Sequence, residues 1–155
     1  MDLKKYLVKE AIRLDLAATT KEETLTLLCD QAARLLRIQA PTVLAAVLER
    51  ESHGSTAVGG GVAIPHGKLA GLNEIFMVLG RTAPGVNLGF DPPDGQPVQI
   101  VTLLLSPLAA ISEHLKVLAL LGRLWKTPKN LGLLLAAPDL DSFYSLFLEL
   151  AATAA

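Results

Sequence analysis

The chain has 155 residues, of which 51% are hydrophobic and 19% are charged. This composition excludes a disordered protein, and one domain of this length can bury about 70% of its unfolded surface without disulfides or metals. Lysine and arginine total 14 against 15 acidic residues, for a net charge of −1. That balance predicts neither a nucleic-acid surface nor a patch for anionic membranes.

The apolar stretches are core segments rather than membrane spans. The longest, residues 100–111, is interrupted by Thr102, Ser106 and Pro107 and is too short to cross a bilayer. The single cysteine, Cys29, falls among apolar helical positions and is expected to be a buried, unreactive thiol. Without cysteine pairs or a signal peptide, the expected location is the cytoplasm.

The N-terminal third predicts one strand followed by two helices. Residues 11–16 alternate between apolar and polar side chains, which is typical of a strand. Thr20 and Glu23 have the spacing of a capping box before an apolar helical period. Pro41 suits the first turn of a second helix, and Gly54 is expected to cap its C-terminus.

Three apolar segments in the middle of the chain predict further strands. Pro65 favours an extended conformation for the residue before it, so residues 62–64 should form a short strand that ends at Pro65-His66-Gly67. Residues 75–79 and 98–105 have strand length. The second of these is nearly continuous in apolar residues, which predicts a central strand covered on both faces.

The C-terminal third predicts three helices, beginning at Ser112, at Thr127-Pro128 and at Asp139. Ser112 is expected to cap the first of them, and Pro138 to end the second. Strands enclosed by helices indicate a single α/β domain spanning residues 1–155. The expected inward residues of the first helix are Leu115, Leu118, Ala119, Gly122 and Trp125, and those of the last are Phe143, Leu146, Phe147 and Leu150.

One segment, residues 50–68, combines groups that suit phosphate chemistry. The planar guanidinium of Arg50 matches a phosphate. Ser55 and Thr56 offer hydroxyl groups, and positive φ angles at the glycines would gather backbone N–H groups into an anion-binding concavity. The predicted phosphate-binding residues are therefore Ser55, Thr56, Gly59, Gly60 and Gly61.

His66 follows this segment and is the candidate nucleophile. With a reference pKa of about 6.5, a sizeable fraction of its imidazole is neutral near pH 7 and can attack phosphorus without first losing a proton. His114 lies at the start of a predicted helix, where the helix dipole favours a neutral ring and an arriving anion. It is expected to orient His66 or to donate a hydrogen bond to its phosphoryl group.

Metal and nucleotide chemistry fit the sequence poorly. The three histidines have no metal-ligand spacing and no accompanying cysteine motif, so neither a metal nor another cofactor is expected. The glycine-rich segment also lacks the Gly-Lys-Ser/Thr ending of a P-loop.

Residues 50–67, which run from Arg50 through Gly-Ser-Thr and a Gly-rich turn to Ile-Pro-His-Gly, resemble enzyme IIA of the phosphotransferase system, of the fructose, mannitol or nitrogen-regulatory type. The resemblance extends to His114-Leu115 and to the Asp94–Val98 turn. It implies a mixed β-sheet between helical layers, with His66 as phosphoryl acceptor and Arg50 and His114 as its active-site partners. Ala57-Val58 and Gly60 depart from the common pattern, which has Gly-Ile and a polar residue there.

The resemblance also implies the partners. The family takes its phosphoryl group from the carrier protein HPr or from the nitrogen-branch relative of HPr. A nitrogen-regulatory protein would then signal by its phosphorylation state through target proteins, which is the favoured interpretation. A sugar-specific protein would instead pass the group to a cysteine of an enzyme IIB. A third possibility is a binding module that keeps the fold without the chemistry.

Overall fold

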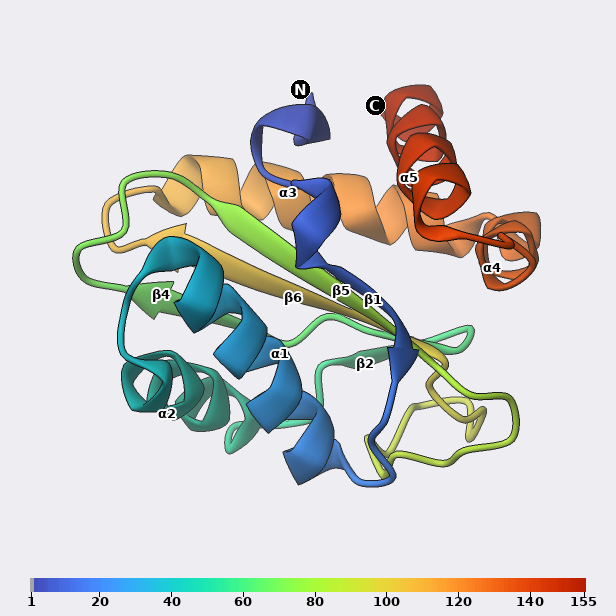
Figure 1. The fold of residues 1–155 in the computed structure, drawn as a ribbon, viewed down its shortest axis with the longest axis horizontal. Coiled ribbons are helices and arrows are strands. Elements are labelled where there is room, and N and C mark those ends of the chain that lie inside the picture. The colour runs from blue at the N-terminus through green and yellow to red at the C-terminus, as the bar shows by residue number, and fades with distance from the viewer. Residues whose placement is uncertain (1) are drawn as a thin grey trace.

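The computed structural model describes residues 2–155, which form a sheet between helices, as predicted (Figure 1). Its six strands, within this range, follow the order β1-β5-β6-β3-β2, and β4 pairs with the same edge of β6 as β3, further along that strand. The sheet is mixed, because β6 is antiparallel to β5 and parallel to β3 and β4. The strands are β1 (Ile12–Leu16), β2 (Ala57–Gly59), β3 (Val62–Ala63), β4 (His66–Leu69), β5 (Phe76–Thr82) and β6 (Ile100–Pro107).

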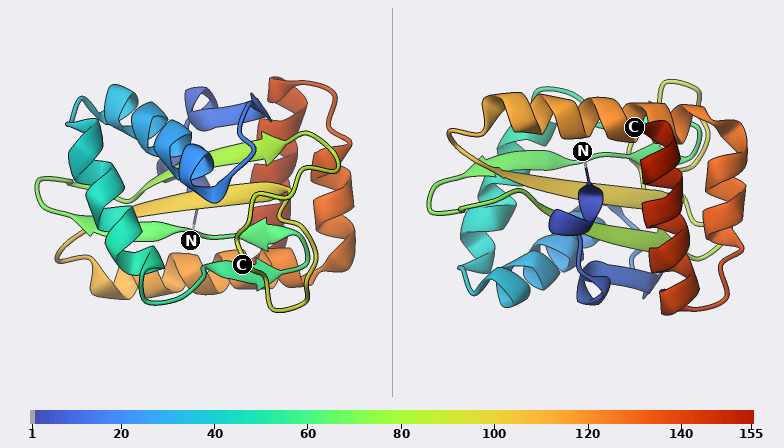
Figure 2. Two further views of the ribbon diagram at one scale, coloured as in Figure 1. Left: turned by 90° about the horizontal axis from the view of Figure 1, so that it is seen from below. Right: turned by 90° about the horizontal axis from the view of Figure 1, so that it is seen from above.

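Helices cover both faces of this sheet (Figure 2). Figures 1 and 2 show α1 and α2 on one side, and α3 and α5 on the other. No helix between residues 2 and 155 is both long and apolar enough to cross a membrane. The helices are α1 (Lys21–Leu36), α2 (Ala40–Glu51), α3 (Ile111–Lys126), α4 (Pro128–Leu135) and α5 (Leu140–Ala154), and two short 3-10 turns, Leu3–Lys5 and Lys9–Ala11, precede β1.

Local sequence signals predicted the starts of α1 and α5 correctly. The Thr20 side chain accepts a hydrogen bond from the backbone N–H of Glu23, and Asp139 likewise accepts one from Ser142, as capping residues do. Strand β6 is buried along residues 100–106 and lies in the middle of the sheet, which confirms the prediction of a central strand. Gly54, however, lies beyond the C-cap of α2, which is Ser52.

Helix α3 differs from the prediction in its start and in its inward face. It begins at Ile111, its N-cap is Ala110, and Ser112 therefore lies inside the first turn without capping it. Leu115 is 61% exposed, whereas Trp125 is buried as expected. The buried face of α3 begins at a polar residue, His114. A pattern of leucines alone therefore predicts the wrong rotation of the helix about its axis. The buried residues of α3 are His114, Val117, Leu120, Leu121, Leu124 and Trp125.

Strands β3 and β4 are two consecutive pieces of one line of pairing along β6. Val62 pairs with Ile100 and His66 with Leu104, so the register continues across the break. Pro65 has no N–H to donate, yet its carbonyl accepts a hydrogen bond from the N–H of Leu104 at 2.9 Å. Strand β3 ends at Ala63, before Pro65, as predicted, but His66 begins a new strand, β4, instead of lying in a turn.

Gly67 allows α2 to pack directly on β4. A Cβ atom at this position would lie 3.2 Å from the carbonyl carbon of Ala46 and 3.3 Å from the nitrogen of Val47. Both contacts are with helix backbone, which cannot move aside as a flexible side chain could. The close approach sets the distance between α2, which carries Arg50, and the strand that begins with His66.

We predict that Gly67→Ala destabilises the protein by about 1–3 kcal/mol, because α2 must move away from β4. Gly122→Ala in α3 is the matched control, since a Cβ atom there meets nothing within 4 Å. That change should stabilise the protein by about 0.5–1 kcal/mol. Urea unfolding followed by circular dichroism measures both values, and equal stability of the two variants would refute the packing argument.

Candidate active site around His66

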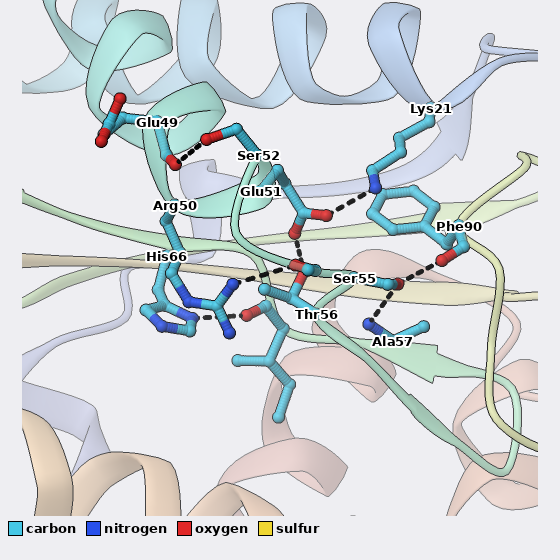
Figure 3. A network of polar contacts seen from close by, with 12 residues as sticks. Lys21, Glu49, Arg50, Glu51, Ser52, Ser55, Thr56, Ala57, His66 and Phe90 are labelled. Atoms are coloured by element: carbon cyan, nitrogen blue, oxygen red, sulfur yellow. Dashed lines mark hydrogen bonds and ion pairs between the residues drawn. The ribbon is translucent and has the colours of Figure 1, made fainter.

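A hydrogen bond to the backbone of Ile64 holds the ring of His66. Its Nδ1 atom lies 2.8 Å from the carbonyl oxygen of Ile64, two residues earlier (Figure 3). A carbonyl oxygen only accepts hydrogen bonds, so Nδ1 carries the proton and Nε2 keeps its lone pair in the neutral ring. No hydrogen bond from residues 2–155 reaches Nε2. The half-buried imidazole therefore offers Nε2 as a nucleophile at the rim of the sheet.

Arg50 lies beside this ring, as predicted from the sequence. It belongs to the last turn of α2, and Figure 3 shows its guanidinium next to His66. One guanidinium nitrogen donates to the carbonyl of Gly54 at 2.9 Å. Gly54 follows the helix with a φ of 138°, a conformation that L side chains rarely adopt. The glycine thus places an acceptor for Arg50 close to the nucleophile.

The hydroxyl groups of Ser55 and Thr56 are engaged in the scaffold of the site (Figure 3). Thr56 donates to the buried carboxylate of Glu51, which also forms an ion pair with Lys21 at 2.5 Å. Ser55 donates to the carbonyl of Phe90 and accepts from the N–H of Ala57. These bonds fix the segment between α2 and β2, but they occupy the two hydroxyl protons that were predicted to bind phosphate.

The glycine-rich turn lies at the far end of β3 from His66, so the structure does not bring these predicted phosphate-binding glycines to the histidine. Val62 and His66 are four strand residues apart, or about 13 Å, and the turn precedes Val62. Its positive φ angles do favour an anion, but the anion is internal. The N–H of Gly60 donates to the Asp94 carboxylate at 2.8 Å, and this bond lowers the pKa of Asp94. The three glycines, Gly59, Gly60 and Gly61, have φ angles of 88°, 63° and 82°.

His114 lies against His66, as the hypothesis of paired histidines requires. The two ring centroids are 5.4 Å apart and the planes are tilted by 58°. His114 is 5% exposed, and its Nδ1 atom lies 2.6 Å from the hydroxyl oxygen of Ser106 on β6. Burial, together with the charges of His66 and Lys68, lowers the pKa of His114 from 6.5 to about 4. The ring is therefore neutral at pH 7.

The surroundings also keep His66 neutral. Burial is the main cause that lowers its pKa below 6.5, and the positive charges of Arg50 and Lys68 act in the same direction. The hydrogen bond to Ile64 and the charge of Glu51 oppose the shift without reversing it. The neutral form, which is the one that can attack phosphorus, is thus favoured over the imidazolium.

Three contributors to the site were not identified from the sequence: Ser106, Lys68 and Glu51. Lys68 lies two residues after His66 on β4, and residues at this spacing share a face of the sheet. Ser106 was noted only as an interruption of an apolar run, although a hydroxyl in a central strand needs a partner. The place of Glu51 in the site is set by its contacts with Lys21 and Thr56. Lys21 is far from Glu51 in the sequence, so no local pattern predicts their ion pair.

Comparison with known proteins identifies the family of this chain. The family profile described as phosphoenolpyruvate-dependent sugar phosphotransferase system, EIIA 2, matches residues 5–150. A nitrogen regulatory protein of Bradyrhizobium diazoefficiens is 39% identical over 155 residues, with all of both chains covered. A fructose-specific EIIA component of Haloferax volcanii is 34% identical over 74% of this chain and 73% of its own.

A solved structure is also similar. The nitrogen regulatory protein IIA-Ntr of Neisseria meningitidis superposes with a TM-score of 0.85 at 30% identity, covering 93% of this chain and 97% of its own. The profile match and the shared mixed sheet between helices define a component of the phosphotransferase system. The chain belongs to the EIIA type 2 family, and its role is that of a phosphocarrier in that system.

We predict that His66 titrates below pH 6.5 and that Lys68→Met moves its midpoint upward. The lysine charge disfavours the imidazolium, so its removal makes protonation easier. Histidine NMR resonances of the unphosphorylated protein, followed from pH 8 downward, measure both midpoints. Lys129→Met on α4 is the control and should leave the midpoint unchanged. A wild-type midpoint at or above 6.5 would contradict the described electrostatics.

Proposed function

We propose that Nε2 of His66 accepts a phosphoryl group from phosphorylated HPr or from its nitrogen-branch relative, in the cytoplasm. The observation that carries this proposal is the hydrogen bond between Nδ1 and the Ile64 carbonyl, which leaves the lone pair on Nε2. In the transfer, the N–P bond of the donor phosphohistidine breaks while a new N–P bond forms at Nε2. No proton has to leave the nucleophile, so no separate base is required.

Arg50 and His114 are proposed to stabilise the phosphoryl group. Phosphoryl transfer depends mainly on alignment and on neutralising the negative charge of the oxygens. The guanidinium of Arg50 donates one of its five N–H groups to the carbonyl of Gly54, so others remain to bind a phosphoryl dianion. His114 contributes its Nε2 side, because Nδ1 is engaged by Ser106.

We favour a nitrogen-regulatory role, in which the phosphorylation state of His66 controls binding to target proteins. The full-length similarity to a nitrogen regulatory protein supports this choice. The alternative is a sugar-specific role, in which an enzyme IIB cysteine receives the phosphoryl group, and the similarity to a fructose-specific component keeps it open. The proximity of Arg50, His66 and His114 argues against a module without phosphoryl chemistry.

An apolar patch beside His114 suits the docking of the phosphorylated carrier. Leu108, Ile111 and Leu115 are 58%, 57% and 61% exposed, although large apolar side chains are usually buried. All three lie on or just before the first turns of α3, which also carries His114. Transfer between two proteins must bring two imidazoles to one phosphorus atom, so the docking surface has to surround the nucleophile.

We predict that incubation with phosphoenolpyruvate, enzyme I and HPr, or with the nitrogen-branch pair, adds one acid-labile phosphoryl group. Intact-mass analysis should detect it in the wild type and not in His66→Ala. His53→Ala is the matched control and should remain phosphorylated, since His53 is exposed and paired with Glu49. Arg50→Gln should slow the reaction roughly a hundredfold, as loss of a charge-stabilising donor does.

Comparing enzyme I and HPr with the nitrogen-branch pair as phosphoryl donors also distinguishes the sugar-specific role from the nitrogen-regulatory role. Faster phosphorylation by the nitrogen-branch pair supports the regulatory role, and faster phosphorylation by HPr with onward transfer to an enzyme IIB supports the sugar role. A wild type that gains no mass with either pair would leave the binding module as the remaining explanation.

We predict that Leu115→Asp raises the apparent KM for the phosphorylated carrier by about tenfold, because it places a charge in the apolar docking surface. Leu133→Asp on α4 is the control, since Leu133 is 45% exposed on a different helix. Initial rates at several carrier concentrations measure the effect. An equal rise in both variants, or none in Leu115→Asp, would place docking elsewhere.

A further inference from the structure

Ser106 is a polar residue at a position where the rest of the strand is apolar. It belongs to β6, and its side chain has no exposure to solvent. Residues of β6 before it are aliphatic except for Thr102. The Ser106 hydroxyl oxygen lies 2.6 Å from Nδ1 of His114. A buried hydroxyl costs free energy unless it is hydrogen-bonded, so this contact is the reason that the serine is tolerated here.

We propose that Ser106 is a positioning residue, which donates its hydroxyl proton to Nδ1 of His114 and thereby keeps the proton of that ring on Nε2. This inference rests on the proposed function, because Nε2–H is the group that would donate to the phosphoryl oxygens on His66. Ser106 itself touches neither His66 nor the phosphoryl group in this scheme and acts through the His114 ring.

The charge state of His114 makes the tautomer decisive. Burial lowers the pKa of this histidine to about 4, so at pH 7 the ring has one donor nitrogen and one acceptor nitrogen. If Nδ1 carried the proton, Nε2 would present a lone pair to a dianion, and the two would repel. If Ser106 donates to Nδ1, Nε2 becomes a neutral donor that needs no further protonation. The second arrangement stabilises the transferring group.

The strand register links this contact to His66. Ser106 pairs with Lys68 in the parallel ladder of β4 and β6, and His66 pairs with Leu104. His66 and Lys68 occupy one face of β4, as do their partners on β6, because alternate residues of a strand share a face. The hydroxyl that orients His114 is therefore fixed to the strand beside the nucleophile.

Thr102 supplies a matched control on the same strand. It is fully buried, four residues before Ser106, and its hydroxyl has no hydrogen-bond partner among residues 2–155. Thr102→Val removes a hydroxyl from β6 without touching His114. Ser106→Ala removes the hydroxyl that contacts His114. Each change removes one buried hydroxyl from β6, but only Ser106→Ala removes a contact of the His114 ring.

The test uses 15N-histidine NMR of the unphosphorylated protein, together with initial rates of phosphorylation. We expect His114 to carry its proton on Nε2 in the wild type and in Thr102→Val, and to mix both tautomers in Ser106→Ala. The phosphorylation rate should fall about tenfold in Ser106→Ala alone, which corresponds to one lost hydrogen bond. Ser106→Thr keeps a hydroxyl and should keep the wild-type tautomer, which provides a second reading if the alanine variant unfolds.

Several outcomes would overturn the proposal. These are a wild-type His114 protonated on Nδ1, a Ser106→Ala variant with unchanged tautomer and rate, or an equal loss of rate in Thr102→Val. The NMR measurement needs no phosphoryl donor. A wild type that takes up no phosphate would therefore refute the proposed function, while the tautomer would still decide the role of Ser106.

Discussion

The site depends on one hydrogen bond between the His66 ring and the backbone carbonyl of Ile64, two residues earlier in the chain. Pro65 separates the two residues, and its own carbonyl accepts from the N–H of Leu104 while the Ile64 carbonyl accepts from the ring. That bond decides which nitrogen is the nucleophile and in which direction the ring lies. The flanking pieces β3 and β4 hold it through their common register on β6.

The electrostatics of the site favour neutral rings and an incoming negative charge. Burial disfavours the charged forms of both histidines, and Arg50 and Lys68 add positive charge near them. A phosphoryl group brings the opposite charge, which the two cations stabilise. Glu51 offsets part of this positive charge without reversing its effect on His66, and a phosphoryl group on Nε2 would add to that compensation. Such a balance suits a carrier, which must accept the group readily and still release it.

Sequence patterns predicted the parts of this protein that depend on near neighbours. The caps at Thr20 and Asp139 and the buried character of β6 follow from a few adjacent residues, and all three predictions were confirmed. The α/β class followed from the order of predicted strands and helices, and the mixed character of the sheet from the family resemblance. The rotation of α3 was wrong because its buried stripe contains His114, which a search for apolar residues passes over.

The candidate site was predicted in part, for a related reason. His66, Arg50 and His114 were predicted and lie together, whereas the glycines seemed near only because they are near in sequence. An extended strand carries the chain about 3.3 Å per residue, so a few residues of β3 suffice to separate them from His66. The pairing of Ser106 with His114 depends on how α3 folds back over β6, which no local pattern contains.

The hairpin between β2 and β3 has a consequence for how this chain can diverge from its relatives. Its N–H group at Gly60 is satisfied by Asp94, and the turn lies at the far end of the ladder from the imidazole. Val58 and Gly60, two of the three positions where the sequence departs from the common family pattern, belong to this hairpin end, whereas Ala57 pairs with Ala63 nearer to His66. A side chain exchanged at Val58 or Gly60 therefore changes the hairpin about four strand residues away from the imidazole rather than the contacts of the ring itself.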